Sequence, residues 1–226
     1  MKTKRLIGFC QILMCSFVLF VACNRSTNET NLNRIETSSF TDSRDGKIYK
    51  TVKIEDQWVM AENLAYKPDK GNFWSYENNE SNISIYGYLY DWETAINIAP
   101  EGWHLPTSDE FIAIRKALGC KRSLITYLEE IYPKLIDGGS SGLNMLLGGM
   151  RTCDGKFMYL GEKARFWTST NNGLKTTGYS EKTVYGLDSN KDGVPHGLRK
   201  STAPMMFQNR QFPESCQGFS VRLFKD

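Results

Sequence analysis

The alternation of apolar and polar residues predicts short strands and helices in the first half of the chain. Lys47–Ile54 alternates β-favouring side chains with lysines, and Gln57–Met60 follows after two acidic residues, which predicts a β-hairpin. Asp91–Ile98 has the pattern of a short helix that ends before Pro100.

The clearest predicted helix begins at a capping box. The Thr107 hydroxyl can accept a hydrogen bond from the Glu110 amide, while the Glu110 carboxylate reaches back to the start of the helix. Apolar residues follow at spacings of three and four up to Leu118, and Gly119 supplies the stop. This pattern predicts a helix with one buried face.

The second half of the chain is irregular. Ser123–Ile136 carries another helical stripe, which Pro133 interrupts. After Asp137, Gly, Ser and Asn dominate, and the predicted strands are short and separated by long polar loops: Phe166–Ser169, Thr183–Leu187 and Gly218–Phe224. Helices followed by irregular β structure predict an α+β domain rather than alternating βαβ units.

The first 22 residues have the layout of an export signal. Three basic residues precede the uncharged apolar run Leu6–Ala22, which is short for a spanning helix of roughly 20 residues. The run ends at Cys23 and resembles the lipobox of bacterial lipoproteins, although Phe20 stands where Leu is usual. We expect a signal peptide at residues 1–22 and lipid on Cys23; the alternatives are cleavage elsewhere or an uncleaved anchor.

The residues after Cys23 set the expected domain organisation and location. Residues 23–40 are polar and read as a flexible tether, so residues 41–226 form the folded domain. The lipid anchor makes the membrane a partner. Asn24 rather than Asp after the cysteine favours the outer membrane, and both a periplasm-facing and a cell-surface orientation remain open.

Charge argues against one class of partner. The chain has 28 Lys and Arg against 25 Asp and Glu, but three of the basic residues precede Cys23, which leaves 25 against 25. Nucleic-acid binders normally carry a clustered basic excess. We therefore expect no nucleic-acid partner.

The histidines indicate no catalytic centre. His104 and His196 are the two histidines, and neither lies in a Ser/His/Asp or His-x-x-x-His arrangement that would activate a nucleophile or hold zinc. His104 is interpreted as a structural imidazole within a turn. We expect no catalytic residues and no enzymatic activity.

One segment resembles half of a calcium loop. Asp188, Asn190 and Asp192, followed by Gly193, offer alternate side-chain oxygens to a hard cation, but the twelfth position is Arg199 instead of Glu. A complete EF-hand is excluded, and a weaker calcium site remains a hypothesis. The alternative is a plain turn between strands. We expect no other cofactor.

Aromatic and amide side chains supply the candidate ligand-binding residues. A ring can stack on apolar surface while an amide both donates and accepts. Trp167 is interpreted as a core residue rather than a surface one. The surface candidates for binding a glycan or a protein are Asn171, Asn172, Tyr179, Tyr185 and Asn190.

Several sequence blocks follow one another in a recognisable order: Asp42–Ile54, Trp58–Leu64, Tyr86–Trp92, Gly102-Trp-His-Leu-Pro-Thr107, Gly148–Arg151 with Phe166–Thr170, and Gly218-Phe-Ser-Val-Arg222. Together they resemble the Fibrobacter succinogenes major paralogous domain, a family found in bacterial lipoproteins and surface proteins. The resemblance spans the chain from Asp42 to its end.

The resemblance implies a fold but no general activity. Similarity of two blocks to the formylglycine-generating enzyme group implies a C-type-lectin-like fold, with two helices, a small twisted antiparallel sheet and long loops. Such an oxidase needs two redox cysteines a few residues apart, whereas Cys153 and Cys216 are 63 positions apart. That activity is therefore not expected.

The cysteines depart from the family pattern. Ala99 and Leu223 stand where family members often have a cysteine pair, and an Ala/Leu contact could fill the same space. Besides Cys23, the mature chain has Cys120, Cys153 and Cys216, so at least one thiol is left unpaired. Which two of them pair is left open.

We interpret the chain as a non-enzymatic envelope lipoprotein with a lectin-like recognition or scaffold domain for a glycan or a protein. A structural lipoprotein that packs against other envelope components is the second hypothesis. A hydrolase or an oxidase is the last.

Overall fold

The computed structural model describes residues 35–120, 131–172, 181–189, 195–203 and 216–226, with the backbone alone for residues 171–172, 181–189 and 195–203. They belong to one compact unit, Ile35–Asp226. The expected signal peptide, Cys23 and most of the expected tether lie outside the described residues. None of the described helices is long and apolar enough to cross a bilayer.

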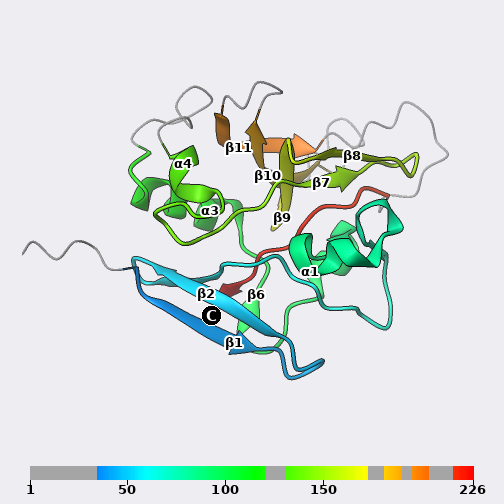
Figure 1. Cartoon of the computed structure of the whole chain (residues 1–226), viewed down its shortest axis with the longest axis horizontal. Coiled ribbons are helices and arrows are strands. Elements are labelled where there is room, and N and C mark those ends of the chain that lie inside the picture. The colour runs from blue at the N-terminus through cyan, green and yellow to red at the C-terminus, as the bar shows by residue number, and fades with distance from the viewer. Residues whose placement is uncertain (1–34, 121–130, 173–180, 190–194, 204–215) are drawn as a thin grey trace, which may run out of the picture. The chain divides into compact units, whose positions relative to one another are not determined.

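The first sheet joins the two ends of the folded unit. It is antiparallel, and its strand order is β1-β2-β3-β12-β6. Figure 1 labels β1, β2 and β6 of this sheet. Its strands are β1 (Thr37–Thr41), β2 (Ile48–Ile54), β3 (Gln57–Met60), β12 (Phe224–Lys225) and β6 (Trp103–His104).

The predicted hairpin is confirmed as β2 and β3. Ile54 pairs with Gln57, and Glu55 adopts a left-handed backbone with φ of 52° in the two-residue turn. β1 lies partly in the expected tether, because Thr37–Ser39 pair with β2. The folded unit therefore begins a few residues before the expected boundary at residue 40.

The second sheet has the strand order β11-β10-β9-β7-β8. β7 and β9 are parallel, and the other neighbours are antiparallel. Its strands are β7 (Gly148–Arg151), β8 (Phe157–Leu160), β9 (Lys163–Asn172), β10 (Glu181–Ser189) and β11 (Pro195–Ala203). A separate two-stranded sheet consists of β4 (Phe73–Trp74) and β5 (Leu89–Tyr90).

The helices are short. They are η1 (Tyr76–Asn78), η2 (Glu80–Asn82), α1 (Ile83–Tyr86), α2 (Trp92–Ile96), α3 (Ser108–Ala117) and α4 (Tyr132–Leu135). The predicted α2 and the capping box of α3 are confirmed. The predicted helix at Ser123–Ile136 lies up to residue 130 outside the described residues. In its described part, Pro133 lies in the first turn of α4, where its missing amide costs nothing. The fold is α+β, as predicted.

The C-terminal segment connects the two sheets. It runs from beside β7 to the first sheet, where it ends as β12 (Figure 1). Gly218, Phe219 and Ser220 form single bridges with three different partners: Arg151, Tyr90 and Phe166. The prediction of one continuous strand over Gly218–Phe224 is therefore wrong, because each residue pairs with a different element.

Two hydrophobic clusters form the core. One packs Val52 and Phe111 against Phe166 and Phe224, and the other contains Tyr90. Trp167 and Leu223 belong to the second cluster, and Ala99 packs against it. Trp167 is 3% exposed and donates its indole N–H to the Tyr90 carbonyl over 2.6 Å, which confirms it as a core residue.

Arg222 is buried between these parts of the fold, with 1% of its surface exposed. Its Nε donates to the Asn63 side-chain oxygen over 2.6 Å, and its Nη1 donates to the carbonyls of Met60 and Leu143. Its Nη2 donates to the Asn144 carbonyl over 2.7 Å. Burial lowers the pKa of Arg222 to about 9, so the group remains protonated at neutral pH.

Replacement of Arg222 by Met should strongly destabilise the domain. The acceptors around it would be buried without donors, which costs about 3 kcal/mol or more. Denaturant unfolding followed by tryptophan fluorescence measures this loss. Lys53→Met is the control, because the exposed Lys53–Glu36 pair, 3.4 Å apart, should change stability by less than about 1 kcal/mol. Equal losses in both variants would contradict a special role for Arg222.

Candidate functional site: a cleft between β2 and α1

An open cleft of about 740 Å³ lies between β2 and α1. Lys47–Lys50 form one wall, and Glu80 together with Ile83–Ile85 forms the other. The floor comes from the segment after β3, Ala61–Asn63. We call this site the β2–α1 cleft.

Asn63 holds the floor of the cleft against α1. Its side-chain amide donates to the carbonyl of Tyr86, the last residue of α1, over 2.8 Å, while its oxygen accepts from Arg222. The buried guanidinium therefore fixes the orientation of the amide, and the amide fixes the end of the helix. The shape of the cleft depends on this chain of hydrogen bonds.

Gly87 lets the chain leave α1 close to the floor. Its φ is 71°, and a Cβ placed there would lie 2.4 Å from the Leu64 carbonyl oxygen. A residue with a side chain would meet both backbone strain and a clash at this position. Only glycine allows this close approach without displacing the floor.

The walls expose aliphatic side chains. Ile48 is 67% exposed and Ile85 is 55% exposed, which makes them the two most exposed large hydrophobic residues in the described part of the chain. Ile83 and Leu146 also line the cleft. A single exposed apolar residue needs no explanation, but neighbouring ones at a cleft are typical of a binding surface.

Most of the charge around the cleft is acidic. Glu62, Glu80 and Asp137 contribute three carboxylates against the ammonium groups of Lys47 and Lys50. Lys47 also forms an ion pair with Asp45 over 3.2 Å. Burial, with a smaller contribution from Glu80, raises the pKa of the Tyr88 phenol.

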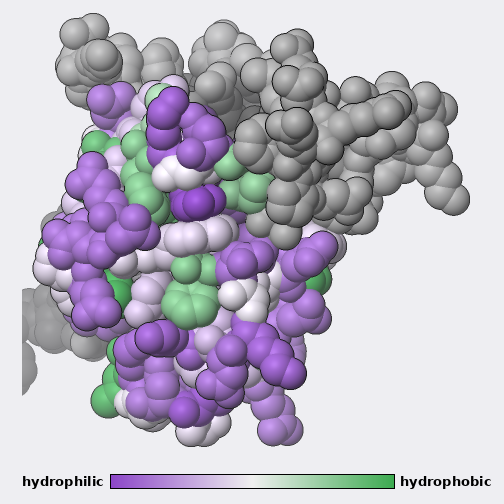
Figure 2. Space-filling view, turned by 90° about the vertical axis from the view of Figure 1, so that its right-hand side faces the viewer, coloured by the Kyte–Doolittle hydropathy of each residue, from purple (hydrophilic) through white to green (hydrophobic). Residues whose placement is uncertain are grey.

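The face on the right-hand side of Figure 1, toward which α1 lies, is mostly hydrophilic where it is coloured (Figure 2). Hydrophobic residues are confined to small areas of this face. Apolar surface is therefore a local feature on this side of the domain.

A second cleft, of about 470 Å³, is polar. Arg44, Tyr66, Asn72 and Asp91 are among its lining residues. The Arg44 guanidinium lies over the Tyr66 ring at 3.7 Å, and Asn72 donates to Asp91 over 2.7 Å. These polar groups largely satisfy one another, so this cleft offers less to a ligand than the first.

The predicted ligand-binding residues do not gather at one place where their backbone is described. Asn171 and Asn172 pair with Lys182 and Glu181 at one end of the β9–β10 ladder. Tyr185 pairs with Phe166, several residues further along the ladder. Tyr179 and Asn190 lie outside the described residues.

The predicted calcium residues can be placed only in part. Asp188 lies in β10 opposite Lys163, at the far end of the ladder from Asn171 and Asn172. Asn190 and Asp192 lie outside the described residues. No cluster of metal-ligating side chains occurs in the part of the chain whose side chains are described.

His104 forms a bridge between two carboxylates. Its Nδ1 lies 2.6 Å from Asp226 Oδ1, and its Nε2 lies 2.7 Å from Glu110 Oε1. Although burial opposes it, hydrogen bonding to both carboxylates raises the pKa of His104. Burial opposes the same change in Glu110, but bonds from Thr107 and His104 lower its pKa. Both ring nitrogens are engaged, which agrees with the structural interpretation.

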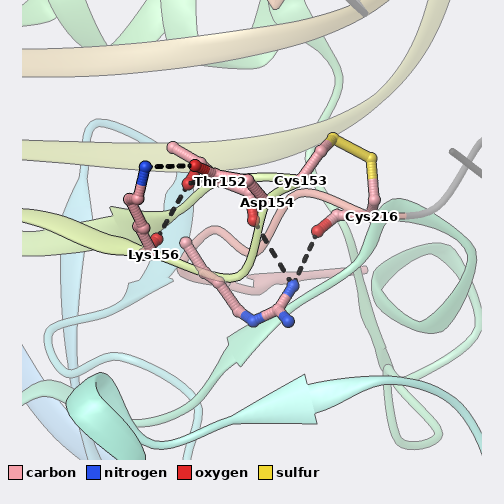
Figure 3. Close-up of a disulfide and its surroundings, with 6 residues drawn as sticks. Thr152, Cys153, Asp154, Lys156 and Cys216 are labelled. Atoms are coloured by element: carbon pink, nitrogen blue, oxygen red, sulfur yellow. Dashed lines mark hydrogen bonds and ion pairs between the residues drawn. A yellow bond between two sulfur atoms is a disulfide. The ribbon is translucent and has the colours of Figure 1, made fainter. Parts of the chain in front are cut away.

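A disulfide joins the β7–β8 turn to the C-terminal segment. Cys153 and Cys216 are bonded and lie 63 positions apart in the sequence (Figure 3). Lys156 pairs with Asp154 over 2.8 Å in the same turn, and hydrogen bonds from Lys156 and Thr152 lower the pKa of Asp154 to about 2. Cys120 is a separate buried thiol. The pairing left open by the sequence is thus Cys153 with Cys216.

One weak signal for the cleft is present in the sequence. Ile48 shares its strand face with Lys50, on the outward side where a second lysine or a polar residue would be usual. Ile85 likewise follows a polar stretch. Neither position shows that the two isoleucines meet at one cleft, because that depends on how α1 is held against the floor.

The His104 bridge predicts a pH-dependent stability. Because its pKa is raised, His104 stabilises the folded domain below the ordinary histidine pKa of 6.5. This stabilisation is lost as the pH rises through the raised pKa. Because its pKa is lowered, Glu110 stabilises the folded domain above pH 4.5. This stabilisation is lost as the pH falls through the lowered pKa. We expect His104→Gln to lose about 0.5–1 kcal/mol near pH 5.5 because the groups are about one-third exposed.

Unfolding free energies at pH 5.5 and pH 8.5 measure this effect. The difference between wild type and His104→Gln should shrink at the higher pH, where the imidazole is neutral. A difference that does not change with pH would show that His104 contributes by packing rather than charge.

Removal of the disulfide should destabilise the domain without changing the fold. Cys153→Ser with Cys216→Ser should lower the free energy of unfolding by about 2–4 kcal/mol, because the unfolded chain regains the freedom of a long loop. Unfolding with and without a reductant measures the loss. The reductant should affect the wild type and leave the double variant unchanged.

Comparison with known proteins gives one match. The family model of the Fibrobacter succinogenes major domain matches residues 41–225. No curated protein and no solved structure matches the chain. The matched range covers every described strand except β1, of which it contains only the last residue, Thr41.

Proposed function

The chain belongs to the Fibrobacter succinogenes major domain family, and from this premise we propose that it is an envelope lipoprotein whose domain binds a ligand in the β2–α1 cleft. The observation that carries this proposal is the exposure of Ile48 and Ile85, which both line one cleft. Exposed apolar surface costs solubility unless a partner covers it. The ligand is a protein or a glycan.

The described chemistry supports binding rather than catalysis. His104 is held between two carboxylates, and Cys153 is held in a disulfide. Neither group is poised as a base or a nucleophile. Within the described part of the chain, the cleft contains carboxylates, amides and lysines, but no base paired with a nucleophile.

We further propose a C-type-lectin-like arrangement. Two features support it: the first and last strands lie in one sheet, and a second sheet is built from residues between them. The helices α2 and α3 come between β3 and the second sheet. This arrangement leaves the second sheet and its loops as a further surface for recognition.

We also propose that Cys23 carries the lipid and that the outer membrane is the location. The polar residues from Asn24 onward separate this cysteine from β1. Several acyl chains on one residue would make the attachment effectively permanent, since each buried CH₂ contributes about 0.8 kcal/mol.

The lipid proposal is tested by intact mass. The native protein should lack residues 1–22 and carry acyl mass on Cys23, and Cys23→Ser should release a soluble or unprocessed chain. A membrane-bound mature Cys23→Ser protein, or a native cysteine without acyl mass, would contradict the anchor.

The binding proposal is tested with a glycan array and a display library of random twelve-residue peptides. Any ligand of the wild type that is lost in Ile48→Asp and kept in Met158→Asp supports the cleft. Met158 is the matched control because it is exposed by 36% on β8, away from the cleft lining. Ligands that bind both variants equally would place recognition elsewhere.

A further inference from the structure

We propose that the β2–α1 cleft binds a protein segment in which an aliphatic or aromatic side chain lies beside a lysine or an arginine. This inference rests on the proposed binding role of the cleft and selects a protein over a glycan. Three features of the cleft carry it: the kind of apolar surface, the sign of the charge and the size.

The exposed apolar surface is aliphatic rather than aromatic. The two tyrosines that line the cleft are engaged elsewhere: Tyr49 stacks on Phe40, with centroids 5.6 Å apart, and Tyr88 packs edge-on against Phe73 at 5.2 Å. Sugar rings are usually recognised by stacking on open aromatic faces, whereas branched aliphatic chains pack well against other apolar side chains. Ile48 and Ile85 therefore favour a protein side chain.

The charge around the isoleucines favours a basic neighbour in the partner. Glu80 and Asp137 take part in no ion pair within the described part of the chain, and Glu62 accepts only a backbone N–H, from Lys50, over 2.8 Å. Lys47 is already paired with Asp45. Glu62 interacts electrostatically with the buried Arg222, and Lys50 is the cleft's ammonium group without an ion pair in the described residues. Glu80 and Asp137 are therefore the carboxylates that a basic residue beside the bound apolar side chain would meet.

The same charge disfavours two other occupants. A neutral glycan would leave the carboxylates without a counter-charge. A second copy of this chain, related by a two-fold axis, would bring its own acidic cleft toward the first, and like charges across an interface cost binding free energy.

The size of the cleft fits a short segment. A volume of about 740 Å³ lies within the range of about 300–1,000 Å³ that is typical of ligand pockets. It holds a few side chains of an extended or helical segment, not a whole domain. We expect a few anchor residues to dominate the affinity.

The test uses the full chain, purified in detergent, and a display library of random twelve-residue peptides. The expected result is enrichment of peptides with an apolar residue next to Lys or Arg. The strongest enriched peptide, labelled with a fluorophore, should bind Ile48→Asp and Ile85→Asp at least tenfold more weakly than the wild type in anisotropy titrations. Met158→Asp should bind within twofold of the wild type.

The charge is tested separately from the apolar contact. Glu80→Gln combined with Asp137→Asn should weaken the same peptide three- to tenfold and flatten the dependence of its affinity on salt. Both positions are outside the core, so the unfolding midpoint should not change. Enriched peptides without basic residues, or an affinity that is insensitive to this double variant, would overturn the charge requirement and with it the proposal.

A glycan array run in parallel tests the cleft as a binding site separately from the protein as its partner. A glycan that binds the wild type and is lost in Ile48→Asp would keep the cleft as a site and overturn the protein partner. Peptides and glycans that bind the wild type and the Ile48→Asp and Ile85→Asp variants equally would remove the cleft itself. Loss of peptide binding alone in those variants supports both.

Discussion

The fold depends on how the Arg222 guanidinium is satisfied. A buried cation without a carboxylate partner is stable only if oxygen acceptors surround it, and here three backbone carbonyls and one amide oxygen do so. These acceptors come from the end of β3 and from the loop before β7. The guanidinium thus requires segments that are distant in sequence to reach their final positions together.

The cleft inherits its geometry from this requirement. Asn63 accepts from Arg222 with its oxygen and donates to α1 with its nitrogen, so the two ends of one amide couple the core to the surface. Asn63, Gly87 and Arg222 all lie in blocks that carry the family resemblance. These three residues shape the backbone that supports the cleft, whereas the exposed residues of its walls would select a ligand.

Local elements could be predicted from the sequence because their signals are local. The capping box at Thr107 and the alternation in Lys47–Ile54 involve residues close in the chain, and both predictions are confirmed. The C-terminal segment could not be predicted as it is, because Gly218, Phe219 and Ser220 each pair with a different element, at Arg151, Tyr90 and Phe166 in turn. The cleft was missed for the same reason, since Ile48 and Ile85 are far apart in the sequence and line one cleft only in the folded domain.

The Cys153–Cys216 bond has a topological consequence for the chain. It closes a ring that contains β8 to β11, and the polypeptide enters and leaves this ring at the two cysteines. A single proteolytic cut inside the ring leaves both fragments covalently joined, and the noncovalent contacts of the C-terminal segment keep them in register. A nicked molecule would therefore separate into two pieces only in conditions that both reduce the bond and denature the fold.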